Sequence, residues 1–184
     1  MKKTNKLMAG LVLGAVMVTG ASAQSSWYIG GGAILKGSAV RTFEFSNGKK
    51  VDLDEDRSSG YYAVIGRKKG AVRFEYETYK TGIEKNSVKE EERSFYNINM
   101  AFELGFLKFW RFTPYVKIGA GYVDNPDLDK SGYSINGGVG MYVNVIKHVE
   151  LDVKYDYKYI AYGFDYYNVY DKLKGLNVGV NFHF

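Results

Sequence analysis

The chain has 184 residues, a formal net charge of +5 and no cysteine, so its length suits one domain and it can form neither disulfides nor a lipid-modified cysteine. With 17 tyrosines, 11 phenylalanines and 22 glycines against 2 prolines, it is rich in strand-forming residues and poor in residues that interrupt strands. Without Lys2, Lys3 and Lys6 the net charge falls to +2, which removes the main support for nucleic-acid binding, so no nucleic-acid partner is expected.

The first 23 residues have the pattern of a secretory signal peptide. Lysines precede the apolar run from Leu7 to Val18, and Ala21-Ser22-Ala23 forms a small-x-small cleavage site at Ala21 and Ala23. The run is shorter than the roughly 20 residues that a spanning helix needs. We therefore predict cleavage after Ala23 and a single mature domain over residues 24–184.

Alternation of apolar and polar residues predicts eight β-strands, because successive side chains of a strand point to opposite faces. The predicted strands are Trp27–Leu35, Gly60–Arg67, Ala71–Lys80, Ser94–Gly105, Pro114–Val123, Tyr133–Val143, Val149–Tyr159 and Gly175–Phe184. The longer predicted loops are Lys36–Ser59, Thr81–Glu92, Asp124–Gly132 and Ile160–Lys174. An even strand number with long loops at one end and short turns at the other predicts an all-β fold, an antiparallel up-and-down transmembrane β-barrel.

Two features favour a membrane barrel with its polar face inside over a soluble barrel with its apolar face inside. Small residues crowd the polar face, which suits a narrow lumen; they are Gly30, Gly32, Gly119, Gly121, Gly138, Gly140 and Gly179. Aromatic residues gather at both strand ends, as expected at the two membrane interfaces. At the short-turn end these include Trp27, Phe106, Phe109, Trp110 and Phe112.

Several short motifs carry a family resemblance. They are W-Y-I-G-G-G at 27–32, V-R-F-E-Y at 72–76, E-L-G-F at 103–106, P-Y-V-K-I-G-A-G-Y at 114–122 and the terminal L-N-V-G-V-N-F-H-F. The mature chain resembles the small eight-stranded outer-membrane barrels of the OmpA transmembrane-domain type. The resemblance implies location in the outer membrane, contact with its lipids, and an assembly signal at Phe182 and Phe184 that the outer-membrane assembly machinery recognises.

Charged residues on the predicted inward faces form a candidate ion-pair network in the lumen. They are Arg73, Glu75, Glu77, Glu103, Lys117, Glu150, Asp152, Lys154, Asp156 and Lys158. Their nearly balanced signs, spread over several strands, favour packing by ion pairs over a catalytic carboxylate pair. Counting from the turns predicts one cluster of Arg73, Glu103 and Lys117, and a contact between Glu150 and His183.

The sequence offers little support for a metal, a cofactor or catalysis. Asp52-x-Asp54-x-Asp56 and the aspartates after Pro126 match only part of a calcium loop, so no metal or cofactor is expected. Both histidines fall at the predicted periplasmic end, away from outer-leaflet lipid, which weakens the alternative of a lipid A-modifying enzyme.

We therefore expect a non-enzymatic barrel with an envelope or adhesin-like role, and a narrow porin-like channel for ions or small solutes is the alternative. The candidate interaction loops are Arg41–Arg57 and Ala161–Lys172, which would meet an extracellular ligand or host surface. Their candidate contact residues are Asp52, Asp54, Asp56, Tyr162, Phe164, Tyr166 and Tyr167. Acidic residues steer charged partners, and exposed tyrosines supply contact area at low entropic cost.

Overall fold

The computed structural model describes residues 25–85, 88–164 and 166–184, and the predicted signal peptide lies outside these ranges. The strands are β1 (Ser25–Phe45), β2 (Lys50–Arg57), β3 (Gly60–Lys69), β4 (Val72–Lys85), β5 (Val88–Glu103), β6 (Phe112–Asn125), β7 (Lys130–Ile146), β8 (Val149–Gly163) and β9 (Tyr167–His183). Two short 3₁₀ turns are η1 (Gly105–Leu107) and η2 (Pro126–Leu128). In the described part of the chain, neither helical turn is long and apolar enough to span a membrane.

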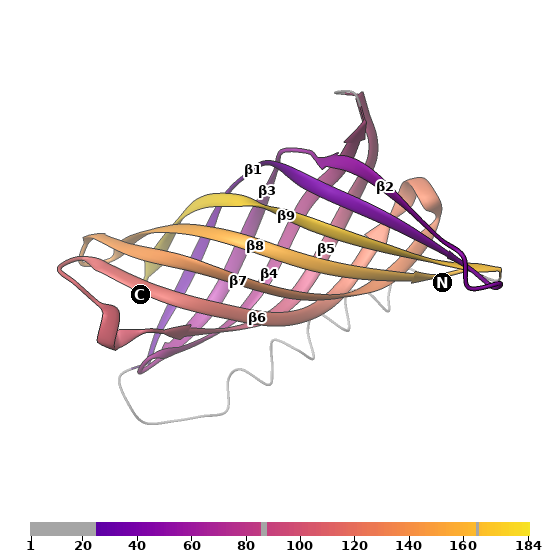
Figure 1. Ribbon diagram of the computed structural model, residues 1–184. Helices are drawn as coiled ribbons and strands as arrows, with labels where there is room; N and C mark the ends of the chain where they lie inside the picture. The colour runs from indigo at the N-terminus through magenta and orange to yellow at the C-terminus, as the bar shows by residue number, and fades with distance from the viewer. Residues whose placement is uncertain (1–24, 86–87, 165) are drawn as a thin grey trace, which may run out of the picture.

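The strands form one antiparallel sheet that closes on itself into a ring (Figure 1). The ring closes where β1 pairs with β9, from Tyr28 opposite His183 to Phe45 opposite Tyr167. Both β2 and β3 pair with β1 on one side and with β4 on the other. They therefore fill a single position in the ring, and the predicted eight-stranded up-and-down barrel is confirmed.

The apolar and polar faces of the sheet are reversed relative to those of a soluble barrel: the apolar face is outside and the polar face is inside. Ile29, Ile118 and Val139 are exposed on the outside of the barrel, whereas Arg73 and Glu77 are almost completely buried inside it. Apolar residues around the outside suit contact with lipid. The lumen is so narrow that a Cβ on Gly179 would overlap the Tyr62 hydroxyl oxygen, which explains glycine at this position of the inner face.

The predicted loops at the extracellular end are wrong over most of their length. Within Lys36–Ser59, β1 continues to Phe45 and β2 returns from Lys50. Most of Thr81–Glu92 and Ile160–Lys174 also belongs to strands. About 9–11 residues of a strand cross the bilayer, whereas β1 has 21, so its upper part stands above the membrane. Outside lipid both faces of the sheet tolerate polar residues, so the alternation of apolar and polar residues that predicts a strand becomes weak. Because the backbone pairing nevertheless continues, segments that the sequence predicts as loops are strands.

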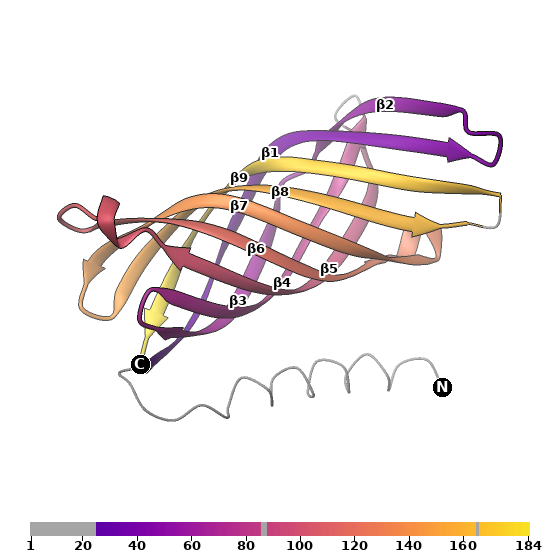
Figure 2. The same cartoon turned by 60° about the horizontal axis from the view of Figure 1, so that its bottom comes forward.

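The upper parts of β8, β9, β1 and β2 (residues 160–164, 166–174 and 37–57) form what we call the projecting sheet. Figure 2 shows its two hairpins extending together beyond the end of the β6–β7 hairpin. The register of β1 with β9 shifts between Ile34 and Gly37, near the gap between β2 and β3 in the neighbouring position. The projecting sheet therefore begins at an irregularity in the barrel wall.

Ser58 joins the interrupted position to β4. Its N–H donates to the Gly82 carbonyl oxygen at 3.0 Å, and its Oγ accepts from the Gly82 N–H at 2.7 Å. Its carbonyl oxygen accepts from the Thr81 hydroxyl at 2.7 Å. The serine thus replaces the ladder hydrogen bonds that the break between β2 and β3 would leave unmade.

Replacing Ser58 with alanine should therefore lower the free energy of unfolding by about 1–3 kcal/mol, because the buried Gly82 N–H loses its acceptor. Urea titration of the protein refolded into lipid vesicles, followed by tryptophan fluorescence, measures the change. The matched control is Ser59→Ala at the exposed neighbouring position, which should leave stability unchanged. Equal effects of the two substitutions would contradict this account of the junction.

Candidate functional site

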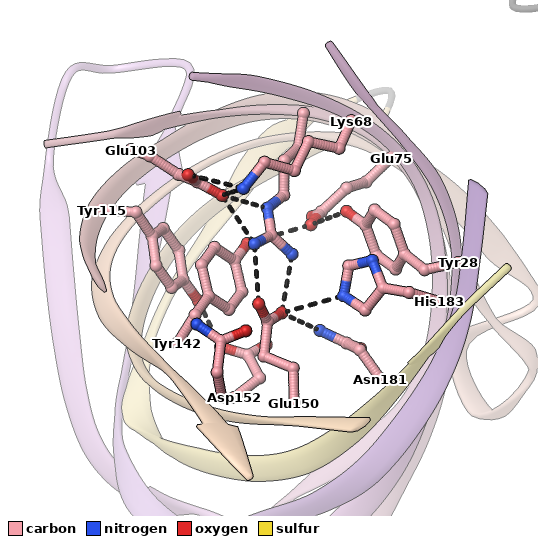
Figure 3. A network of polar contacts seen from close by, with 12 residues as sticks. Tyr28, Lys68, Glu75, Glu103, Tyr115, Tyr142, Glu150, Asp152, Asn181 and His183 are labelled. Atoms are coloured by element: carbon pink, nitrogen blue, oxygen red, sulfur yellow. Dashed lines mark hydrogen bonds and ion pairs between the residues drawn. The ribbon is translucent and has the colours of Figure 1, made fainter. Parts of the chain in front are cut away.

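The periplasmic end of the lumen is organised around Arg73 on β4. Its guanidinium lies 2.7 Å from Glu150 Oε1 on β8 and 2.6 Å from Glu103 Oε1 on β5, so it spans the lumen. Glu103 also binds Lys68 (Figure 3). Glu150 lies 3.5 Å from His183 Nε2, and this second contact is the one that the sequence predicts. Each carboxylate thus has at least two cationic or hydrogen-bonding partners, which offsets the cost of removing its charge from water.

Tyrosines fill the remaining space beside this pair of carboxylates. The Tyr28 hydroxyl donates to Glu75 at 2.6 Å, and the Tyr115 hydroxyl donates to Asp152 at 2.6 Å. The Arg73 guanidinium lies 3.6 Å from the centre of the Tyr142 ring, close enough for a cation–π contact. Figure 3 shows these rings pointing into the lumen around the central ion pairs.

The next layer of the lumen surrounds Glu77 on β4. Three lysines approach its carboxylate, with Nζ–O distances of 2.6 Å for Lys154, 3.1 Å for Lys117 and 3.7 Å for Lys158. Lys117 also lies 3.8 Å from Asp156. A single buried carboxylate therefore attracts three cations from two different strands.

The predicted cluster of Arg73, Glu103 and Lys117 is wrong in its third member. Arg73 does meet Glu103, but Lys117 binds Glu77 and Asp156. In the register of β5 with β6, Glu103 lies opposite Tyr115, and Lys117 is two residues farther from the periplasmic end. Ala101 on β5 lies opposite both Arg73 and Lys117, so these two cations occupy neighbouring positions in the ladder. Their like charges favour separate carboxylates, and the Lys117 side chain reaches Glu77 and Asp156.

Above the Glu77 layer the lumen becomes apolar. Five fully buried side chains from five strands belong to one hydrophobic cluster: Ile83, Phe95, Val123, Ile160 and Leu173. Phe95 stacks on Tyr79 with ring centres 4.2 Å apart. These side chains separate the lower charges from the extracellular opening.

A second charged cluster caps the apolar layer from the extracellular side. Arg41 donates to both oxygens of Glu91 at 2.6 Å and lies 3.0 Å from Asp171 Oδ1. Arg93 bridges the same two acids at 2.8 Å each. Sequence reasoning missed this cluster because all four of its members fall in or beside predicted loops, where the inward direction of a side chain cannot be counted from a strand.

Two ends of a predicted interaction loop turn out to be interior residues. Arg41 is part of the upper cluster, and Arg57 is completely buried with its Nη2 donating to Asn177 Oδ1 at 3.2 Å. Because β1 and β2 are strands of the barrel and not loops, these arginines point into its interior. A partner outside the cell cannot contact them.

The candidate contact residues divide into exposed and buried groups. Asp52, Asp54 and Asp56 are exposed on β2, and Tyr166 is exposed beyond β8. Tyr162 is buried in the hydrophobic cluster, so its assignment to the interaction surface is wrong. It lies on the inward face of β8, in phase with Lys158 and Ile160, and this phase is what a loop assignment cannot reveal.

Phe164 and Tyr167 occupy an intermediate position. They are half-buried, pack against the hydrophobic cluster and stack on each other with ring centres 4.7 Å apart. At the tip of the other projecting hairpin, Lys50 Nζ lies 3.1 Å from Glu44 Oε1, and this hydrogen bond lowers the pKa of Glu44. Each of the two projecting hairpins therefore has contacts of its own near its end.

Among the described residues, no group of three or more histidines and acidic residues has the arrangement of a metal site.

At the periplasmic rim, η1 and its flanks expose large apolar side chains, and Trp110 is 78% exposed. These exposed side chains match the aromatic belt that is expected where the periplasmic face of the outer membrane meets water.

An apolar outer surface, a closed sheet and a charged interior together define an integral outer-membrane β-barrel. The chain belongs to the outer membrane protein β-barrel domain family, whose model matches residues 7–184, and it lies in the outer membrane. No curated protein matches the chain.

Solved structures with similar folds are small outer-membrane proteins. Neisserial surface protein A has a TM-score of 0.60 and 16% identity, over 88% of this chain and 100% of that chain. Ail of Yersinia pestis, in complex with the heparin analogue sucrose octasulfate, has a TM-score of 0.43 and 16% identity, over 88% and 100%. OprG from Pseudomonas aeruginosa has a TM-score of 0.40 and 9% identity, over 87% and 96%. At these identities the similarity to neisserial surface protein A extends to the fold alone.

Replacing Arg73 with glutamine should lower the free energy of unfolding by about 3–5 kcal/mol, because Glu103 and Glu150 would be left without their shared cation. Unfolding by urea in lipid vesicles measures the loss. Lys68→Gln is the matched control, because Lys68 also binds Glu103 but is 31% exposed, and it should cost only about 0–1 kcal/mol. Similar losses in both variants would show that Arg73 does not hold this end of the lumen together.

Proposed function

We propose that the protein is a non-enzymatic outer-membrane barrel that presents its projecting sheet to a ligand or host surface outside the cell. The observation that carries the proposal is the contrast between a filled lumen and an extended sheet above the membrane. Material cannot pass easily through such a barrel, but a partner can reach its extracellular end.

The lumen argues against the alternative of a channel. Conduction needs a continuous path lined by groups that bind an ion weakly enough to release it. Here Arg73 spans the periplasmic end, Glu77 with its lysines fills the middle, and the apolar cluster lies above them. An ion moving through would have to displace three successive layers of direct contacts.

The projecting sheet supports contact with a partner. β1 and β9 remain paired up to Phe45 and Tyr167, so the sheet is rigid well above the lipid. Its outer face carries exposed acidic residues on β2, and Tyr166 is 83% exposed at the tip. Rigid presentation of charged and aromatic side chains lowers the entropy lost on binding.

Two further partners belong to the proposal. Outer-membrane lipids would cover the apolar outer surface, and the outer-membrane assembly machinery would recognise the strand that ends in Phe182 and Phe184. Both side chains are exposed on the outside of the barrel, where a partner can reach them before insertion.

Shortening the β1–β2 hairpin should abolish or strongly reduce adhesion of expressing cells to host cells or immobilised matrix proteins. Arg41 and Leu53 already face each other, so an Asn-Gly turn can replace residues 42–52 without changing the register. The shortened protein should still show the shift in gel mobility on heating that marks a closed barrel.

Electrical recording of the intact protein in planar bilayers separates this proposal from the channel alternative. The expected result is no stepwise conductance from the intact or the shortened barrel. Regular conductance steps, or unchanged adhesion after shortening, would refute the surface-interaction function.

A further inference from the structure

The projecting sheet ends in an open strand edge. β2 pairs with β1 along its whole length, from Lys50 to Arg57. On its other side, across the described residues, it pairs with β4 only at Asp56 and Arg57. Figure 2 shows β2 as the outermost strand of the sheet, diverging from the β4–β5 hairpin. The segment from Lys50 to Asp54 thus has one side available for another strand.

The hydrogen-bond phase identifies which peptide groups face the open side. The Phe45 N–H donates to the Lys49 carbonyl oxygen at 3.0 Å, so in this antiparallel pair every second residue onward from Lys49 bonds to β1. The N–H and C=O groups of Val51, Leu53 and Glu55 therefore face β1, whereas those of Asp52 and Asp54 face away from it. The Ser58 N–H, which is in phase with Asp52 and Asp54, donates to β4 and agrees with this assignment.

The side chains of this segment differ between its two faces. Val51 and Leu53 share the inner face with their partners Phe43 and Arg41, and both are exposed apolar residues. Asp52, Asp54 and Asp56 share the outer face and are exposed. A strand added beside β2 would place alternate residues against the aspartates and the others against Val51 and Leu53.

We propose that the open edge of β2 binds an extended polypeptide segment in which basic and apolar residues alternate. The backbone of the segment pairs with Asp52 and Asp54, its basic side chains lie beside the three aspartates, and its apolar side chains cover Val51 and Leu53. This inference rests on the proposed surface-interaction function and names the partner's chemistry.

A second copy of this chain is a poorer occupant of the same edge. If two β2 strands paired antiparallel with Leu53 at the centre, Asp52 of each would face Asp54 of the other, and like charges directly opposite each other are destabilising. The aspartates therefore discourage self-association at an edge that would otherwise invite it. A partner with lysine or arginine at alternate positions removes this repulsion.

Fluorescence anisotropy with a short labelled peptide of alternating lysine and valine tests the proposal, using the full-length protein in detergent micelles. Asp54→Pro removes an N–H donor from the open side and leaves the bonds to β1 in place, so affinity should fall at least about tenfold. The matched variant Asp54→Asn keeps the N–H group and should lose less affinity. Combining Asp52→Asn, Asp54→Asn and Asp56→Asn should also weaken binding and reduce its dependence on salt.

Peptide controls separate edge pairing from simple charge attraction. A peptide of alternating glutamate and valine should not bind, and a lysine–valine peptide with a central proline should bind at least about tenfold more weakly. Equal binding of the proline-containing and proline-free peptides, or unchanged affinity in Asp54→Pro, would overturn the proposal. So would a dimer in micelles that Asp54→Pro converts to a monomer, since the occupant would then be a second copy.

A failure of the edge-binding proposal can be distinguished from a failure of the proposed surface-interaction function. If shortening the β1–β2 hairpin abolishes adhesion while Asp54→Pro leaves both adhesion and peptide affinity intact, the surface function stands and the edge is not its binding site. If neither change affects adhesion, the surface-interaction function itself fails.

Discussion

Lipid offers no hydrogen-bond partner to a peptide group, so a sheet that spans a membrane must close on itself. In this protein the pairing of β1 with β9 closes it, and the other features of the barrel depend on that closure. A ring of eight positions encloses a space just wide enough for side chains. The inner face must then hold the polar half of every strand, and charges withdrawn from water must find partners there.

The lumen meets this requirement in layers. Arg73 satisfies two carboxylates from opposite walls, and Glu77 collects lysines from β6 and β8. Apolar side chains then fill the space between Glu77 and the upper charged cluster. The result is an interior that stabilises one register of the strands, because sliding any strand by one residue would turn its charges towards lipid.

Above the membrane the constraint on the backbone is relaxed, since water can satisfy an unpaired peptide group. The wall is interrupted at Ser58, and among the residues that the structure describes β2 pairs with β4 only at Asp56 and Arg57. A strand edge can stay unpaired only above the membrane, because in lipid each unpaired N–H would cost several kcal/mol. The same relaxation that permits the open edge makes it available to a partner.

The sequence by itself determined the fold class, the number of positions in the ring and the direction in which the charged residues point. Inside lipid one face must be apolar and the other polar, so residues such as Glu150 and Lys154 reveal their direction by their spacing. Contacts between adjacent strands near a turn, such as Glu150 with His183, could also be counted.

Only the tertiary structure decided where the strands end and which charges meet across several strands. The barrel's tilt and register place Lys117 beside Glu77, and no local pattern encodes that distance. Arg41, Arg93 and Tyr162 lie where alternation is no longer enforced by lipid. Their burial therefore depends on the pairing of β1 with β9, of β5 with β4 and of β8 with β9. The open edge of β2 is likewise set by how far β4 follows it, which is a property of the assembled sheet.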